Sequence, residues 1–462
     1  MYHAVTLLEK IKLFVIILWP ILVTELSYFG MNLIDTIMSG QAGTNDLAGV
    51  SIGASLWLPV FTGVNGVLLS LTPMIGQLLG NNDRRSITDI VTQGFYVAVL
   101  FGLLILGSGW LFLDSVLSVM SLDPAVHHIA KHYLIGLSFG VIPFFLSMVV
   151  RNFFDAQGYP RITMTIMLAV LPLNFLFNYC LIFGKFGAPE MGGIGAGYAT
   201  ALSYGIVLIL SAVMTFRVDI MKPYRIFRQW TAPSWNAWKK QLRIGIPLGL
   251  SLFFEASIFS AVTLFMGAMF DTVTIAAHQA AFSFTSIIFM IPLSISLALT
   301  IVTAFEVGAR RLDHARQYSR IGVGAAVCII SVSSCLIYVF RHDIGWIYTN
   351  NPEVVALAGQ FLVFAIFYQF SDAAQSTLQG VLQGYKDVTV PFFTSFVSYW
   401  LLGLPAGYVL AAHTALGPFG WWIGITVGLT SAAAGFFIRL RIVQRRHAAS
   451  LDVQRAADDT LS

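Results

Sequence analysis

The chain has 462 residues, of which 57% are hydrophobic and only 10% are charged, and its mean hydropathy is +0.78. Soluble domains usually carry about 25% charged residues, so this composition excludes an ordinary water-soluble fold. The net charge of +4 excludes little, because in a membrane protein the position of Lys and Arg along the chain matters more than their sum.

Apolar stretches recur along the whole chain, and each is long enough to cross a hydrocarbon core as a helix. The first stretch is too long for a signal peptide and lacks a small-residue cleavage site, so we expect a retained span. We expect twelve spans, near residues 12–38, 47–79, 88–114, 129–154, 161–183, 192–217, 242–269, 274–308, 318–340, 354–383, 388–411 and 418–442.

Basic residues gather on one side of these twelve spans. If both termini are cytoplasmic, that side receives the Lys and Arg residues of alternate loops, the middle linker and the tail, and only Lys131, Lys185 and Arg341 lie elsewhere. Such asymmetry predicts cytoplasmic termini. We interpret the basic linker and tail as topology signals near anionic lipid headgroups, so we expect no nucleic-acid partner.

A polar, basic stretch with aromatic residues, VDIMKPYRIFRQWTAPSWNAWKK, separates the sixth span from the seventh. This composition is typical of an interfacial connector. The predicted organisation is an amino-terminal six-helix lobe over residues 1–217, a cytoplasmic amphipathic linker over 218–241, a carboxy-terminal six-helix lobe over 242–446 and a cytoplasmic tail over 447–462.

The two halves repeat one another at an offset of about 226–228 residues. Matching positions include Pro20 with Pro247, Thr72 with Thr300, Gly80 with Gly308, Gly158 with Gly384 and Gly197 with Gly424. Because six spans is an even number, both halves enter the membrane from the same side, and the repeat is parallel, with a pseudo-twofold along the membrane normal. Such a body has a central cleft that rocking can open to either face.

Acidic residues inside spans are costly and usually mark an ion or substrate path. In the amino half, Asp35 lies near the outer end of the first span; it is either a coupling residue or a helix-end residue that reaches water. Asn174 and Asn178 are four residues apart on one helix face. We expect them and Thr200 to face Asp35, although such amides also serve as hydrogen-bond links between helices.

Two further residues of the first span are candidates. Glu25 either lines the same cavity as Asp35 or forms a structural ion pair with Lys131. Pro20 removes a helical hydrogen bond, and the kink makes it a candidate hinge, although proline is common in spans.

In the carboxyl half, Glu255 lies mid-span with no cation nearby in sequence. Tyr368 and Asp372 lie one turn apart on one helix face. They can share a proton or, with Glu255, offer hard oxygen ligands to Na⁺; the alternative is a structural hydrogen-bonded pair. Since Asp372 falls opposite Leu146 in the repeat, we expect two unequal ion sites.

Several motifs are missing from the sequence. No phosphate-binding Gly-x-x-x-x-Gly-Lys-Ser/Thr occurs, because Phe186 follows Lys185 in the nearest fragment. There is no nucleophile elbow, and no metal-ligand partner accompanies His278. We therefore expect no cofactor and no enzyme activity, and any work must draw on an ion gradient of H⁺ or Na⁺.

The chain resembles the NorM branch of the multidrug and toxic compound extrusion (MATE) family. The resemblance covers nearly the whole chain and rests on LIDTIMSG, DLAGVSIGASLWLPV, NYCLIFGKFGAPEMGGIGAGYATA, GIPLGLSLFFEAS, AAHQAAFSF, LQGYKD and YWLLGLPAGY. It implies twelve helices in two lobes, an amino-lobe acid at Asp35 surrounded by Asn174, Asn178 and Thr200, and a carboxyl-lobe cation site at Glu255, Tyr368 and Asp372. Glu25 departs from the family pattern.

The resemblance also implies a function: antiport of cationic or amphipathic drugs, such as fluoroquinolones and dyes, against H⁺ or Na⁺ across the bacterial inner membrane. We expect a monomer in the lipid bilayer. An alternative is a two-lobed flippase of lipid-linked precursors, which predicts a strongly cationic cavity, whereas the charges within these spans are mostly acidic. A membrane-embedded enzyme is disfavoured by the missing motifs.

Overall fold

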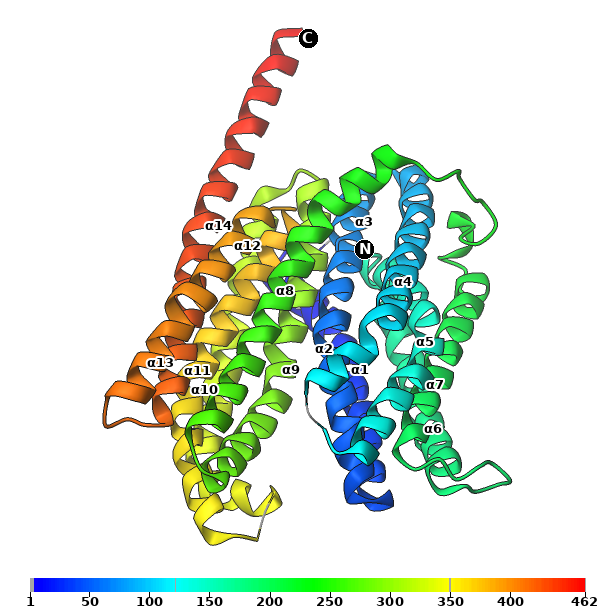
Figure 1. Cartoon of the computed structure of the whole chain (residues 1–462). Coiled ribbons are helices and arrows are strands. Elements are labelled where there is room, and N and C mark those ends of the chain that lie inside the picture. Colours follow the sequence, from blue (N-terminus) through cyan, green and yellow to red (C-terminus); the bar gives the residue numbers. More distant parts are fainter. Residues whose placement is uncertain (1–3, 121, 349, 462) are drawn as a thin grey trace. The chain divides into compact units, whose positions relative to one another are not determined.

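The computed structural model describes residues 4–120, 122–348 and 350–461, and these residues form helices and connecting turns without a β-strand (Figure 1). The helices are α1 (Leu7–Ala42), α2 (Thr44–Leu69), α3 (Leu71–Gly80), α4 (Arg84–Val119), α5 (Pro124–Ala156), α6 (Pro160–Phe183), α7 (Gly193–Arg217), α8 (Trp235–Met269), α9 (Thr272–Gly308), α10 (Leu312–Tyr348), α11 (Pro352–Gly384), α12 (Thr389–Phe396), α13 (Leu404–His413) and α14 (Phe419–Leu461).

Eleven helical stretches among the described residues are long and apolar enough to cross a membrane. Two of them combine neighbouring helices: Thr44–Gly80 contains α2 and α3, and Thr389–His413 contains α12, a π-helical turn over Val397–Gly403 and α13. Outside these eleven, α1 is a continuous helix of 36 residues where the first span is predicted. The all-helical membrane fold is therefore confirmed, with helix at each of the twelve expected places.

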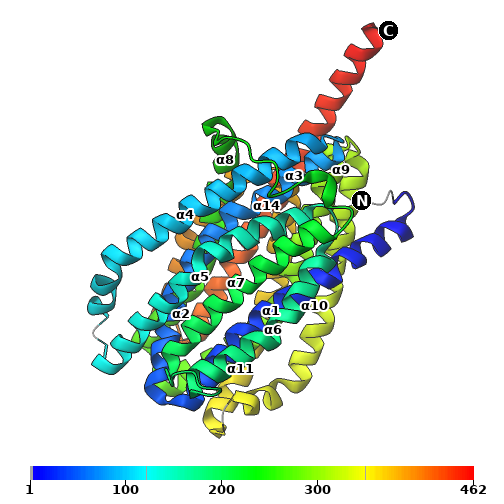
Figure 2. The ribbon, with the colours of Figure 1, turned by 90° about the vertical axis from the view of Figure 1, so that its right-hand side faces the viewer.

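Contacts group the chain into two compact units. The amino unit holds Trp19–Leu78 and Asp83–Gly249; the carboxyl unit holds the chain from Leu250 onward, the residues up to Leu18, and Leu79–Asn82. In the amino unit, α5 packs against α2, α4 and α7, and α6 packs on α7 (Figure 2). In the carboxyl unit, α11 packs against α9, α10 and α14, and α13 packs on α14. The same pairing in both units agrees with the predicted duplication.

Glycines at matching repeat positions allow helices to approach closely. A Cβ at Gly197 on α7 would lie 2.2 Å from the carbonyl oxygen of Tyr133 on α5, and one at Gly424 on α14 would lie 2.4 Å from the Cα of Gly407 on α13. Small residues have this role in membrane helix packing. Gly80 also allows a close approach, because a Cβ at this position would lie 2.1 Å from the carbonyl oxygen of Phe305.

The segment expected as a linker, residues 218–241, packs on α4 within the amino unit. The Gln93 side-chain amide donates to the Ala232 carbonyl (2.9 Å) and accepts from the Trp238 indole N–H (2.8 Å). The Phe227 ring stacks on Phe95 at 5.0 Å between centroids. Since α8 begins at Trp235, the last residues of the expected linker are already helical.

Candidate functional site

Asp35 on α1 is buried among polar side chains of α6 and α7. Asn178 Nδ2 donates to Asp35 Oδ1 at 2.7 Å, and Thr200 Oγ1 donates to Oδ2 at 2.6 Å. Asn174 supports this contact indirectly. Its backbone carbonyl accepts from Asn178 Nδ2 (3.0 Å), and its Nδ2 donates to Ser203 Oγ (3.2 Å). These contacts give both carboxylate oxygens a donor.

This arrangement suits a group that gains and loses a proton. A threonine hydroxyl can donate to a carboxylate or rotate to accept from a carboxylic acid, whereas an amide N–H can only donate. Thr200 can therefore keep its contact with Asp35 in both protonation states, while the Asn178 N–H favours the ionised state. Asn178 Oδ1 makes no hydrogen bond within the described part of the chain.

The carboxyl unit contains Glu255 on α8, Tyr368 on α11 and Asp372 on α11. The two carboxyl groups interact electrostatically with each other and with the Tyr368 phenol. The Tyr368 hydroxyl contacts the side chain of Thr285 on α9, and the Asp372 carboxyl contacts Ser376. Among the described residues no hydrogen bond joins Tyr368 to Asp372, so the expected alternative of a directly bonded pair is not formed.

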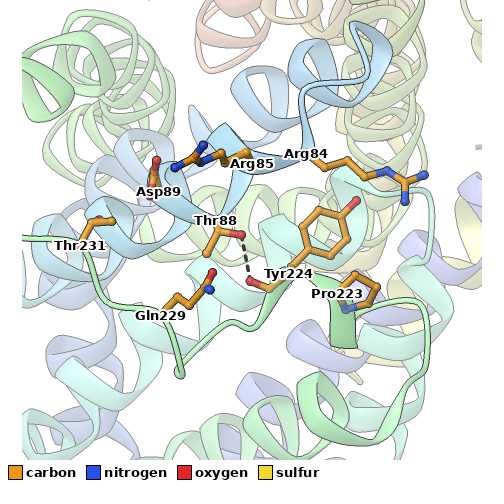
Figure 3. A pocket seen from close by; sticks show the side chains of 8 residues that line it. All are labelled: Arg84, Arg85, Thr88, Asp89, Pro223, Tyr224, Gln229 and Thr231. Atoms are coloured by element: carbon orange, nitrogen blue, oxygen red, sulfur yellow. Dashed lines mark hydrogen bonds between the residues drawn. The ribbon is translucent and has the colours of Figure 1, made fainter.

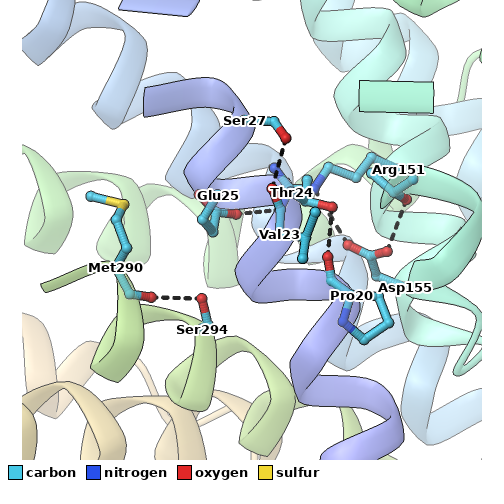
Figure 4. Close-up of polar contacts among 10 residues, drawn as sticks. Pro20, Val23, Thr24, Glu25, Ser27, Arg151, Asp155, Met290 and Ser294 are labelled. Atoms are coloured by element: carbon cyan, nitrogen blue, oxygen red, sulfur yellow. Dashed lines mark hydrogen bonds and ion pairs between the residues drawn. The ribbon is translucent and has the colours of Figure 1, made fainter. Parts of the chain in front are cut away.

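Glu25 differs from the expectation. Its carboxylate pairs with the Arg151 guanidinium on α5 and not with Lys131, which pairs with Asp114 at 2.8 Å (Figure 4). The Lys131 alternative is therefore wrong. Arg151 Nε also lies 3.4 Å from Asp155 Oδ2, so Glu25 belongs to a three-residue ion-pair network.

Pro20 lies inside α1, and the helix continues through it. One turn later, the Thr24 hydroxyl donates to the Pro20 carbonyl at 2.8 Å, as Figure 4 shows. This side-chain bond competes with the backbone hydrogen bond at the same carbonyl, an arrangement that often bends helices.

The buried acidic residues divide into two groups. Five acidic side chains in the described chain are buried: Asp35, Asp155, Glu255, Glu306 and Asp372. Asp155 pairs with Arg151, and Glu306 pairs with Arg311 at 2.6 Å. The other three form no ion pair with any described residue, and all three are among the four acids that the sequence marks as candidates; the fourth, Glu25, pairs with Arg151.

A cavity of about 510 Å³ lies between α4 and the linker in the amino unit. Figure 3 shows its lining: Arg84, Arg85, Thr88, Asp89, Pro223, Tyr224, Gln229 and Thr231. Nearby, Asp83 caps α4 by accepting from the Ser86 backbone N–H at 3.2 Å, and it also accepts from the Ser86 hydroxyl at 2.7 Å. These hydrogen bonds lower the pKa of Asp83 below its usual value. None of the predicted site residues lines this cavity.

A model of the MatE family matches residues 20–180 and 247–409, which is more than half of the chain. The chain belongs to the MatE family. The two matched segments fall in the two repeats, and proteins named probable multidrug resistance protein NorM are similar over nearly the full length. The protein from Halalkalibacterium halodurans is 49% identical, covering 96% of both chains; that from Oceanobacillus iheyensis is 47% identical, covering 96% of this chain and 100% of the relative.

Solved structures of MATE transporters share the fold. An outward-facing multidrug resistance MATE family transporter superposes with a TM-score of 0.87 at 19% identity, covering 95% of this chain and 97% of that one. The eukaryotic MATE transporter AtDTX14 gives 0.84 at 21% identity, covering 96% and 99%. The family match, the NorM-named relatives and the spanning helices together make this MatE-family chain a multi-pass membrane transporter and not an enzyme.

Two polar residues near the candidate sites escaped the sequence analysis. Arg151 is one of the basic residues on the side expected to be cytoplasmic, so the charge pattern gives it no other role. Its spacing of four residues from Asp155 places both side chains on one helix face, which was a usable signal for an ion pair. Gln375 is fully buried and contacts the Glu255 carboxyl. Its position three residues after Asp372 places both side chains on one helix face, which was the available signal.

Proposed function

We propose that this chain exports cationic and amphipathic drugs, such as fluoroquinolones and dyes, in exchange for H⁺ or Na⁺ by alternating access. The names of the relatives at 47–49% identity support multidrug export. The antiport part rests on the residues. An ion can drive export only by binding two conformations with different affinity.

The observation that carries the proposal is the set of three buried carboxyl groups without an ion-pair partner. A charged side chain inside a membrane span costs roughly 2.5–3.5 kcal/mol on insertion scales, and pairing normally offsets this cost. Asp35, Glu255 and Asp372 form no such pair among the described residues, although Glu306 and Asp155 do. A mobile H⁺ or Na⁺ is the missing partner in this proposal.

The proposed sites follow the sequence prediction. Asp35, with Asn174, Asn178 and Thr200, serves ion coupling in the amino lobe, and Pro20 acts as a hinge. Glu255, Tyr368 and Asp372 hold the coupling cation in the carboxyl lobe. Contacts of Asp35 with Asn178 and Thr200 support the first site. Glu25 is a less suitable cavity residue, because Arg151 occupies its carboxylate.

The proposed membrane arrangement is a monomer in the bacterial inner membrane with both termini cytoplasmic. Its lobes are residues 1–217 and 242–446, joined by the linker 218–241, and the tail is 447–462. The distribution of Lys and Arg supports this orientation. The flippase alternative requires a cationic cavity. It has less support, because five of the six buried Asp, Glu, Lys and Arg side chains in the described chain are acidic.

Drug resistance and ethidium efflux in a pump-deficient bacterial strain test the export. Wild type should raise resistance and dye efflux, and Asp35→Asn should abolish both at equal expression. Asp114→Asn is a matched control, because this acid is exposed and paired with Lys131. Full activity of Asp35→Asn would exclude the amino-lobe mechanism.

Proteoliposomes with an imposed pH or Na⁺ gradient identify the coupling ion. Efflux should follow one gradient or both, and Asp372→Asn should remove the Na⁺-driven part. Efflux that is unaffected by either gradient would contradict antiport altogether.

A further inference from the structure

Several buried oxygen atoms in the carboxyl unit make no hydrogen bond with any described residue, and among them are Glu255 Oε2, Asp372 Oδ1 and the hydroxyl of Tyr399. All three side chains are at least nine-tenths buried. Leaving a buried polar group without a partner costs roughly 1–3 kcal/mol by mutational data. Such atoms in one region indicate a ligand that the protein alone does not supply.

The three oxygens belong to one neighbourhood, although they come from α8, α11 and the π-helical turn. The Tyr399 phenol interacts electrostatically with Glu255 and with Asp372, and the two carboxyl groups interact with each other. Gln375 connects them further, because its side chain contacts both the Glu255 carboxyl and the Tyr399 phenol. The three side chains therefore lie close enough to interact with one another.

Hydrogen bonds to α8 flank Tyr399, one at the π-helical turn and one at Ser395 near the end of α12. The Trp400 indole N–H donates to the carbonyl of Phe254 at 3.4 Å, next to Glu255 in sequence. One turn earlier, the Ser251 hydroxyl donates to the Ser395 hydroxyl at 3.2 Å. A π-helical turn shifts the following side chains by one position and is frequent at functional sites. Here it contains Tyr399, whose phenol interacts electrostatically with Glu255.

We infer that the Tyr399 hydroxyl is a further oxygen ligand of an alkali cation held between Glu255 and Asp372. Hard cations are bound by carboxylate and neutral oxygen atoms, and a phenol adds an oxygen without adding negative charge. Tyr368 lies close by and its hydroxyl contacts Thr285, as the Tyr399 phenol contacts Ser395 and Gln375. Of these two hydroxyls, only that of Tyr399 is a buried oxygen without a hydrogen bond to a described residue. Tyr399 thus completes the cation site. This inference rests on the proposed function of the carboxyl lobe.

Tyr399→Phe tests the inference, because it removes one oxygen and keeps the ring. The readout is the unfolding temperature of the purified full chain as NaCl replaces choline chloride at constant ionic strength. We expect Na⁺ to stabilise wild type and the Na⁺ concentration for half the effect to rise about tenfold in the variant, equivalent to about 1.4 kcal/mol. Without Na⁺, the variant should unfold at nearly the same temperature as wild type, since the lost hydroxyl makes no hydrogen bond with any described residue.

A structural role for the hydroxyl gives a different result. If Tyr399 served packing alone, Tyr399→Phe would either lower the unfolding temperature equally with and without Na⁺ or change nothing, and either outcome overturns the inference. Tyr408→Phe is the matched control, because Tyr408 is an exposed tyrosine on α13. Its Na⁺ response should equal that of wild type.

A second readout keeps the test decisive if Tyr399→Phe unfolds in detergent. In membrane vesicles at matched expression, the Na⁺ concentration for half-maximal dye efflux should rise, whereas the maximal rate stays near wild type. Tyr399→Gln, which returns a side-chain oxygen, should recover part of the difference. If wild type exports dye without any response to Na⁺, the assignment of Tyr399 as a cation ligand is wrong, but drug export is not contradicted. If wild type does not export dye at all, the proposed function is contradicted.

Discussion

Arg151 on α5 holds Glu25 on α1 and Asp155 on its own helix, so one guanidinium joins two carboxylates inside the amino unit. The Asp155 carboxyl also accepts from the Thr163 hydroxyl on α6 at 3.0 Å. A single network therefore connects α1, α5 and α6 of this unit. Its residue on α1, Glu25, lies five residues after Pro20.

The first prediction concerns this ion pair. Glu25→Ala should lower the free energy of unfolding by about 1–3 kcal/mol, because a nearly buried guanidinium loses one of its two carboxylate partners and keeps only Asp155. The measurement is thermal unfolding in detergent. Lys131→Ala, which breaks an exposed pair, should cost about 0–1 kcal/mol. Equal losses in the two variants would contradict the distinction between them.

The second prediction concerns the hydroxyl at Asp35. Thr200→Val should reduce dye efflux at least severalfold, because a hydrogen bond to a charged group contributes about 1.5–3 kcal/mol. Thr200→Ser keeps the hydroxyl and should retain most of the activity. Thr215→Val is the control, since its hydroxyl bonds only to the Ser211 carbonyl of the same helix. An active Thr200→Val would show that Asp35 does not need this donor.

The third prediction concerns His278 on α9. The Trp422 indole N–H donates to His278 Nδ1 at 3.2 Å; because an indole can only donate, the ring proton must be on Nε2, which lies 3.1 Å from Thr263 Oγ1. His278 is thus a neutral link between α8, α9 and α14. Thr263→Val should cost about 1–3 kcal/mol of stability without abolishing efflux.

Thermal unfolding and dye efflux measured on the same preparation check this third prediction. Ser257→Ala is its control, because the Ser257 hydroxyl bonds only within α8. Loss of efflux in Thr263→Val with stability intact would instead assign His278 a place in transport.

The fourth prediction concerns pH. Burial lowers the pKa of Lys386, in the turn after α11, from its ordinary value of 10.5 to about 8. Between these values the unfolded chain binds the proton and the folded chain does not, so stability should rise as the pH increases from about 8 to 10.5. Below pH 8 the half-buried ammonium costs up to about 3 kcal/mol.

Lys386→Met removes this penalty. The variant should be more stable than wild type at pH 7, and the gap should close as the pH rises toward 10.5, in unfolding experiments at several pH values. A gap that stays constant across this range would show that Lys386 keeps its proton in the folded chain.

Much of the fold follows from the sequence, because hydrophobic length and the internal repeat are local or periodic properties. Asn178 and Asn174 could be placed on one helix face by their spacing alone. The pairing of Glu25 with Arg151 could not be predicted, since it joins the first span to the fourth and no spacing rule relates them. The π-helical turn at Tyr399 also escaped prediction. Hydrogen bonds to α8 flank this turn, and such contacts between distant parts of the chain cannot be read from local composition.

The carboxyl unit contains short segments from the first half of the chain, and this matters for any attempt to express the two halves from a split gene. This unit includes the start of α1 and Leu79–Asn82, both encoded in the first half. Lys10 hydrogen bonds to Gln317, and Gly80 lies against the Phe305 carbonyl. A fragment cut after the linker would lack both pieces and expose the surfaces they cover. Co-expressed halves, in contrast, could restore these contacts, so complementation in a split gene would report on the docking of these segments.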